Sequence, residues 1–289
     1  MGGDERIISI LGLGPMGFRV AELFVEAGFQ TIVWNRTFEK ASPLTARGAT
    51  VVRAASDAIA ASRTTIAVLA TAEALKNILE ISDLAGKTIV NLGSASQQET
   101  KIISKLVQDC GGEYVSGSIY ANPSNLSTGD SAIIYSGRSS LTSLDSFMGV
   151  LSPTAIFIGD DPEHNKILSL SICTQMYIGI MGFLEGARLA QTVNVSAAAY
   201  ANFVISLLGP FYRKMITNLG TRIDEGNLAG DESMIGTEAH IANLVRAQFG
   251  QAGLKSEGME LFSSYIDRAI ELGQRDNGIA ALYDVIHRR

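Results

Sequence analysis

The residues of this sequence whose spacing indicates chemistry begin with three glycines, in the run Gly12-Leu13-Gly14-Pro15-Met16-Gly17. An apolar run of strand length precedes them and an amphipathic helical pattern follows them. In this setting the first glycine allows a tight turn, the second lets a pyrophosphate approach the backbone, and the third lets the helix pack against the strand. The helix N-terminus then receives the phosphates. The stretch therefore predicts a dinucleotide site rather than a strand–helix turn with incidental glycines.

The end of the second predicted strand indicates which dinucleotide is bound. A site specific for NAD usually has Asp or Glu there, to accept a hydrogen bond from the ribose 2′-hydroxyl. This chain has Asn35-Arg36-Thr37, with Lys40 one turn further on. The planar guanidinium of Arg36 suits a phosphate. We therefore expect the cofactor to be NADPH, with its 2′-phosphate on Arg36, Thr37 and Lys40.

Two later predicted strands should reach the reactive end of the cofactor, because doubly wound sheets bind ligands at the carboxyl ends of their strands. The first of these strands ends at Leu69 and Ala70, and the second ends near Asn91, Gly93 and Ser94. We expect these residues to complete the cofactor site.

Composition excludes several classes of protein. The chain has 289 residues and a formal net charge of −6 without a run of like charges, which argues against a nucleic-acid partner. Its two cysteines, Cys110 and Cys173, show no metal-ligand or redox spacing, and two thiols in a chain of this size fit a reducing cytosol. The polar N-terminus leads directly into the first strand, without a targeting pattern. We expect a cytoplasmic protein with no metal.

The order of strands and helices predicts an α/β Rossmann domain followed by an all-α domain. Strands alternate with helices as far as residue 158, which is typical of a doubly wound, mostly parallel sheet. Beyond Pro162 the pattern is helical, with a break at Gly209-Pro210 and a loop at 223–234. We expect three regions: an NADP-binding domain (1–162), a long interdomain helix (163–192), and a C-terminal helical domain for dimerisation and substrate binding (193–289).

The long helix is unusually apolar. No residue of 167–184 is charged, and this length is at the lower limit for crossing a bilayer. The segment also contains serine, threonine, glutamine and glycine, and a helix that is apolar on most faces in a soluble protein is buried. We therefore expect it to lie between domains or subunits and not in a membrane.

The glycine run, taken with Val33-Trp34-Asn35-Arg36-Thr37-Phe38-Glu39-Lys40, resembles the NADPH-dependent imine reductases and reductive aminases, relatives of the β-hydroxyacid dehydrogenases. The resemblance extends over the whole chain and includes the segments 117–123, 135–137 and 159–162. It implies a homodimer that exchanges helical domains, so that each active site is shared between chains. It also implies transfer of hydride from NADPH to the carbon of an imine, which is supplied as such or formed from a ketone and an amine.

The resemblance also assigns residues to the active site. Members carry Asp eight residues before a Tyr on the long helix, whereas this chain has Ser169 before Tyr177. A serine hydroxyl is a poor acid near neutrality, so Tyr177 becomes the expected proton donor or orienting group, and Ser169 is either catalytic or a small packing residue. Helix geometry places the two about 80° and roughly 12 Å apart. The resemblance places further residues around the substrate: Tyr120, Asn122, Cys173, Phe211 and His240.

Two other interpretations stay open. A β-hydroxyacid dehydrogenase needs a Lys on the same helix with an Asn one turn later; Lys166 is close, but Leu170 follows it at that distance. The Asn122-Pro123 segment also lacks the Gly-Gly turn with which that group binds a carboxylate. The second interpretation is a protein that binds NADPH without catalysis, because the usual Asp is missing.

Overall fold

The computed structural model describes residues 6–138, 144–230 and 234–287, and the chain forms two compact units, residues 1–173 and 174–289. The expected start of a helix at 141 lies outside the described residues, as do most of the polar N-terminus and part of the loop expected at 223–234. The division between the units falls within one long helix, while the expected domain boundaries were at 162 and 192.

The first unit is built on a single sheet. Its strands follow the order β3-β2-β1-β4-β5-β6-β7-β8, and all neighbouring strands are parallel except β6 and β7. The strands are β1 (Ile7–Leu11), β2 (Gln30–Trp34), β3 (Thr50–Val51), β4 (Thr64–Ala67), β5 (Thr88–Asn91), β6 (Glu113–Tyr120), β7 (Ala132–Ser136) and β8 (Thr154–Phe157). The expected mostly parallel, doubly wound sheet is confirmed.

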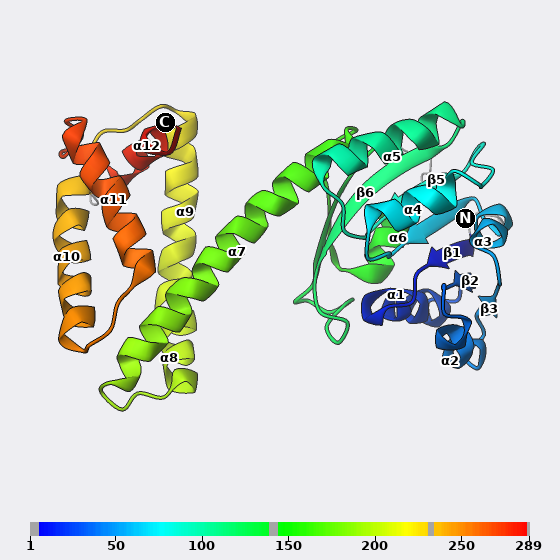
Figure 1. Cartoon of the computed structure of the whole chain (residues 1–289), viewed down its shortest axis with the longest axis horizontal. Coiled ribbons are helices and arrows are strands. Elements are labelled where there is room, and N and C mark those ends of the chain that lie inside the picture. The colour runs from blue at the N-terminus through cyan, green and yellow to red at the C-terminus, as the bar shows by residue number, and fades with distance from the viewer. Residues whose placement is uncertain (1–5, 139–143, 231–233, 288–289) are drawn as a thin grey trace. The chain divides into compact units, whose positions relative to one another are not determined.

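Helices cover both faces of this sheet (Figure 1). They are α1 (Pro15–Glu26), α2 (Ser42–Thr45), α3 (Ala55–Ala61), α4 (Ala72–Leu79), α5 (Gln97–Asp109) and α6 (Leu144–Leu151), with a 3₁₀ turn at Phe38–Ala41. Helices α1 and α6 contribute Val20 and Phe147 to one apolar core, while α3, α4 and α5 contribute Ile59, Leu75 and Ile103 to the other. Because both faces of the central strands are covered, even their polar residues, such as Ser9, Thr65 and Thr88, are buried, and buried residues do not alternate with exposed ones.

Helix α7 (Pro162–Gln191) is the long helix expected from the sequence, and its first turns are fastened to the sheet. Asn165 is fully buried, and its side-chain amide donates to the carbonyl of Ile134 at 2.7 Å and accepts from the Ser118 hydroxyl at 2.9 Å. Its backbone N–H donates to the Ser136 hydroxyl at 3.1 Å. These bonds fix the rotation of α7 on β6 and β7, so they determine which α7 side chains face the ends of the strands.

The second unit is helical, as expected. It contains the rest of α7 with α8 (Ala197–Phe203), α9 (Gly209–Asp224), α10 (Ile235–Gln251), α11 (Glu257–Glu271) and α12 (Leu282–His287). Its small core joins α10, α11, α12 and the 3₁₀ turn Ile279–Ala281 through Ile235, Ile266, Ala269, Ala281 and Val285.

One boundary prediction in this unit is wrong. The expected break at Gly209-Pro210 is absent, because a π-helical turn (Val204–Leu208) connects α8 to α9 without a loop. Pro210 is the second residue of α9 and directly follows the π-helical turn, where the register of the helical hydrogen bonds changes. The loop expected from 223 agrees with the helix ends to within two residues, since α9 ends at Asp224 and α10 begins at Ile235.

Candidate functional site

The glycine loop between β1 and α1 has the geometry of a phosphate cradle. Gly12 has φ +93°, and a Cβ added there would lie 2.5 Å from the carbonyl oxygen of Val68. A Cβ on Gly17 would lie 2.0 Å from the Gly12 oxygen, so neither position accepts another residue. A Cβ on Gly14 would meet nothing within 4 Å. The backbone at Gly14 therefore borders open space, where the pyrophosphate of a dinucleotide fits, and α1 begins there with no side-chain cap on its N–H groups.

Asn35 connects this loop to the end of β2. Its side-chain oxygen accepts from the Leu13 N–H at 2.9 Å, and its amide donates to the Thr37 carbonyl at 2.8 Å. Both the oxygen and the nitrogen of the Asn35 side chain thus form hydrogen bonds within the protein, and one of these bonds takes the Leu13 N–H. The sequence predicts Leu13 and Asn35 as cofactor ligands, together with Pro15 and Met16, which begin α1. In the structure the bonds of Asn35 also hold the shape of the loop, and the contacts of these residues with the cofactor stay predictions.

Arg36, Thr37 and Lys40 follow β2 as exposed residues, at the carboxyl edge of the sheet where the 2′-phosphate is expected. The structure adds Arg53, which follows β3 at the same edge. Its guanidinium lies 4.5 Å from the centre of the Phe38 ring, and its carbonyl accepts from the Trp34 indole at 3.2 Å. The local sequence around Arg53 does not indicate this position, which follows from the parallel pairing of β2 with β3.

The ends of β4 and β5 meet through Leu69, Asn91 and Gly93. A Cβ on Gly93 would lie 2.4 Å from the Leu69 oxygen, and the side chain of Leu69 also borders Gly12. Asn91 is buried; its oxygen accepts from the Gly93 N–H at 2.9 Å, and its amide donates to the Tyr114 hydroxyl at 3.0 Å. Burial raises the pKa of Tyr114 to about 12, so this phenol stays neutral. Asn91 therefore shapes the turn, while Ala70 and Ser94 are exposed beside it.

The first turns of α7 bring three predicted site residues together. Ser169 is 7% exposed, and its hydroxyl donates to the Lys166 carbonyl of the preceding turn at 3.2 Å. The phenol of Tyr120, at the end of β6, donates to the Ser169 carbonyl at 3.3 Å. Burial, and then the nearby Cys173, raise the pKa of Tyr120. Tyr120, Ser169 and Cys173 thus form one wall at the carboxyl end of β6, while Asn122 is exposed beyond it.

Lys166 is a further residue at this wall, and its burial was not expected. It is 4% exposed, and its ammonium donates to the carbonyls of Gly117 at 3.0 Å and Gly93 at 3.3 Å. Burial lowers its pKa to about 8. Nothing in the local sequence indicates this position, since it depends on the rotation of α7 that Asn165 fixes.

Three predicted site residues belong to the second unit: Tyr177, Phe211 and His240. All three are exposed within the single chain, Tyr177 and Phe211 by 62% and 63% of their surface. Their roles in the site stay predictions.

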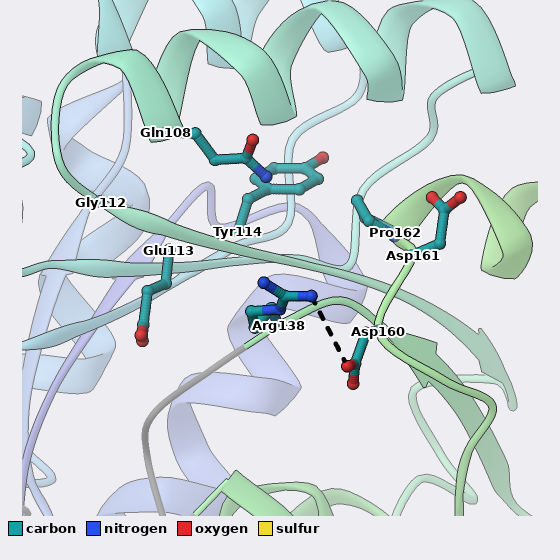
Figure 2. Close-up of a pocket in the computed structure, with 8 residues that line it drawn as sticks. All are labelled: Gln108, Gly112, Glu113, Tyr114, Arg138, Asp160, Asp161 and Pro162. Atoms are coloured by element: carbon teal, nitrogen blue, oxygen red, sulfur yellow. Dashed lines mark ion pairs between the residues drawn. The ribbon is translucent and has the colours of Figure 1, made fainter.

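A separate hollow of about 460 Å³ lies at the amino end of β6, where Glu113 and Tyr114 line it (Figure 2). Arg138 and Asp160 face each other across it at 4.0 Å. It lies at the opposite end of β6 from Tyr120 and contains no predicted site residue. Among the residues described, no group of three or more His, Cys, Asp and Glu side chains could hold a metal ion.

Comparison with known proteins agrees with this geometry. Residues 7–159 match the family model described as the NAD binding domain of 6-phosphogluconate dehydrogenase, and residues 161–288 match the NADPH-dependent reductive aminase-like C-terminal domain. An NADPH-dependent reductive aminase from Aspergillus oryzae is 28% identical over 97% of both chains. An imine reductase structure from a Pseudomonas species has a TM-score of 0.90 at 27% identity, covering 97% of this chain and 99% of the other. A reductive aminase from Aspergillus terreus, solved with NADPH and ethyl levulinate, has a TM-score of 0.87 at 29% identity with the same coverage.

The fold and the site define an oxidoreductase with a dinucleotide-binding Rossmann domain. The chain belongs to the family with the NAD binding domain of 6-phosphogluconate dehydrogenase, in the group that joins it to a reductive aminase-like C-terminal domain. The resemblance to imine reductases and reductive aminases is thereby confirmed.

Proposed function

We propose that this chain uses NADPH to reduce C=N bonds, either in small imines or in imines formed from a ketone and an amine. The observation that carries the proposal is that one chain combines two parts. The first is an open glycine loop, with Arg36 nearby at the end of β2, and the second is a C-terminal domain of the reductive aminase type. A panel of cyclic imines and ketone–amine pairs, followed by NADPH absorbance at 340 nm, tests it. Turnover of 3-hydroxy acids with NADP⁺ alone would favour the dehydrogenase interpretation instead.

The proposed reaction needs orientation more than strong acid catalysis. NADPH supplies the hydride, and the chain's residues hold the acceptor carbon close to it and exclude water. Residues 12–17 hold the pyrophosphate, and Leu69, Gly93 and Ser94 border the reactive end. We assign to Tyr177 the role of orienting the nascent amine, or giving it a proton, through its phenol.

The Ser169 hydroxyl is expected to contribute little to the chemistry, because it donates to its own helix at the Lys166 carbonyl. Ser169→Ala should change kcat/KM less than about threefold, within the range of one weak hydrogen bond. Ser169→Asp should raise activity toward neutral imines, since a carboxylate stabilises the cation formed on protonation. A neutral cyclic imine and an N-alkylated iminium salt, assayed in parallel, measure both effects, and the preformed iminium should be the better substrate of the unaltered chain. An inactive Ser169→Ala variant would contradict this assignment.

We further propose that two chains form a homodimer, with the helical domain of each completing the partner's site. Within the single chain α7 exposes a row of large apolar side chains, among them Leu170, Tyr177, Ile178 and Leu184. By length and composition α7 could also cross a membrane, and 6% of its most apolar window is buried. In the second unit a groove of about 880 Å³ is lined by Met181, Tyr200, Phe249 and Phe262. An apolar surface of this extent fits an obligate interface between two copies.

The dimer should persist at nanomolar concentration without detergent. Analytical ultracentrifugation with a fluorescent label measures this directly, and Leu184→Glu, which puts a charge on the apolar row, should shift the chain toward monomer with loss of activity. Lys101→Glu on the exposed face of α5 is a matched control that should stay dimeric. A folded and active monomer would contradict the proposal, and so would a chain that needs detergent to stay in solution.

We also propose a cytoplasmic location. It is supported by the two cysteines, which are both free, one exposed and one half-buried.

A further inference from the structure

Arg53 lies at the same carboxyl edge of the sheet as Arg36, but it follows a different strand. It is the second residue after β3, and the parallel ladder continues past that strand, because the Val52 N–H donates to the Val33 carbonyl at 3.1 Å. Arg53 therefore leaves β3 at the edge where Arg36 leaves β2. Doubly wound sheets bind dinucleotides at this edge, so both arginines belong to the part of the sheet that receives the cofactor.

Two aromatic residues hold Arg53 in place. The indole N–H of Trp34, the last residue of β2, donates to the Arg53 carbonyl at 3.2 Å and so fastens the backbone after β3 to β2. The guanidinium lies over the exposed ring of Phe38, 4.5 Å from its centre, in a cation–π contact. Both aromatic residues come from the short segment that also carries Arg36. The charge of Arg53 is thus held toward this segment before any ligand binds.

The contact with Phe38 leaves the hydrogen-bonding edge of Arg53 free. A guanidinium that lies over a ring uses its face, while its five N–H groups stay in its own plane. Among the described residues, none accepts a hydrogen bond from this guanidinium, and neither Glu39 nor Asp57, the carboxylates of the two adjoining segments, forms an ion pair with it. Positive charge without a paired carboxylate at a ligand-binding edge suits an anion.

We infer that Arg53 is a second ligand of the cofactor 2′-phosphate, so that the phosphate is bound by Arg36 after β2 and by Arg53 after β3. A phosphate monoester has three acceptor oxygens and carries close to two negative charges, more than one guanidinium satisfies. Phe38 is a positioning residue, because its ring holds the guanidinium without taking any of its N–H groups. NADH has a hydroxyl in place of the phosphate and gains little from Arg53. The inference concerns the choice of cofactor and stands whether or not the chain reduces C=N bonds.

The test compares the dissociation constants of NADPH and NADH, measured by quenching of Trp34 fluorescence. Trp34 is the only tryptophan of the chain, and its emission overlaps the absorption of both reduced cofactors. Arg53→Ala removes the cation, Arg53→Lys keeps a charge without the planar fork, and Phe38→Leu removes the ring. Arg6→Ala is the matched control, since Arg6 is exposed at the amino end of β1. The Trp34 bond uses the Arg53 backbone, so it persists in every variant and the fold should be kept, as circular dichroism checks.

Arg53→Ala should raise the NADPH Kd roughly three- to thirtyfold, the range of one charge-assisted hydrogen bond that solvent partly screens, and should leave the NADH Kd within about twofold. Its NADPH Kd should also depend less steeply on ionic strength. Arg53→Lys should lose less, and Phe38→Leu should weaken NADPH alone by a few fold. Adding Phe38→Leu to Arg53→Ala should change nothing further, because the ring acts only through the arginine.

Equal weakening of both cofactors in Arg53→Ala would overturn the inference, since Arg53 would then contact the adenosine or shape the loop. Unchanged Kd values for both would also overturn it, because Arg53 would be a solvated surface residue. A further loss of NADPH affinity when Phe38→Leu is added to Arg53→Ala would contradict the positioning role of Phe38. If the Kd values change as expected but no imine is reduced, the proposed function fails while this inference holds.

Discussion

Replacing Tyr177 by phenylalanine should lower kcat for imine reduction by roughly ten- to a thousandfold, toward the range that general acids contribute. The substitution removes only the hydroxyl, which is the group expected to orient the nascent amine or give it a proton. The phenol is exposed in the single chain, so its loss leaves no buried polar partner and should not unfold the protein. Steady-state kinetics with a cyclic imine at saturating NADPH measure the effect.

The matched control for Tyr177 is Tyr265→Phe on α11, where the ring packs against Arg268. This variant also loses one phenol from the helical unit, and kcat should stay within about twofold. A silent Tyr177→Phe together with an inactive Ser169→Ala would mean that the two α7 residues have the opposite roles.

Replacing Arg36 by alanine should weaken NADPH binding roughly ten- to a hundredfold, because a charge-assisted hydrogen bond to the 2′-phosphate contributes about 1.5–3 kcal/mol. NADH has no such phosphate, so its affinity should barely change. Kd values for both cofactors, measured by fluorescence at one fixed ionic strength, make the comparison.

A control for Arg36 is Arg6→Ala, since Arg6 is an exposed residue at the amino end of β1, away from the carboxyl edge of the sheet. Both cofactors should bind this variant as they bind the unaltered chain. If Arg36→Ala weakened the binding of NADPH and NADH equally, the 2′-phosphate would not bind at Arg36.

The parts of the fold that the sequence predicts well are those specified by short stretches. Gly12 and Gly17 occupy positions that exclude any side chain, so their spacing alone indicates the loop. Most strands are short runs rich in apolar and β-branched residues, and α7 is an uninterrupted helical pattern, so both are recognisable from the sequence. The confirmed resemblance depends on these same local features.

The parts that the sequence does not predict depend on contacts between distant residues. Asn35 follows β2 and Asn91 ends β5, as cofactor ligands would, and each side chain also bonds to a neighbouring turn. Lys166 is buried because Asn165 fixes α7 on strands some thirty to fifty residues away. Arg53 reaches the cofactor edge through the pairing of β2 with β3. No local pattern encodes these arrangements.

The central claim, hydride transfer from NADPH to the carbon of a C=N bond, is tested most directly by isotope transfer. The chain is incubated with 2-methyl-1-pyrroline and NADPH that carries deuterium at both C4 positions, and the product is examined by mass spectrometry and NMR. The account predicts 2-methylpyrrolidine with one deuterium on the ring carbon that was doubly bonded to nitrogen, formed in step with NADPH oxidation. NADPH that binds tightly and yields no deuterated amine from any imine tested would contradict it.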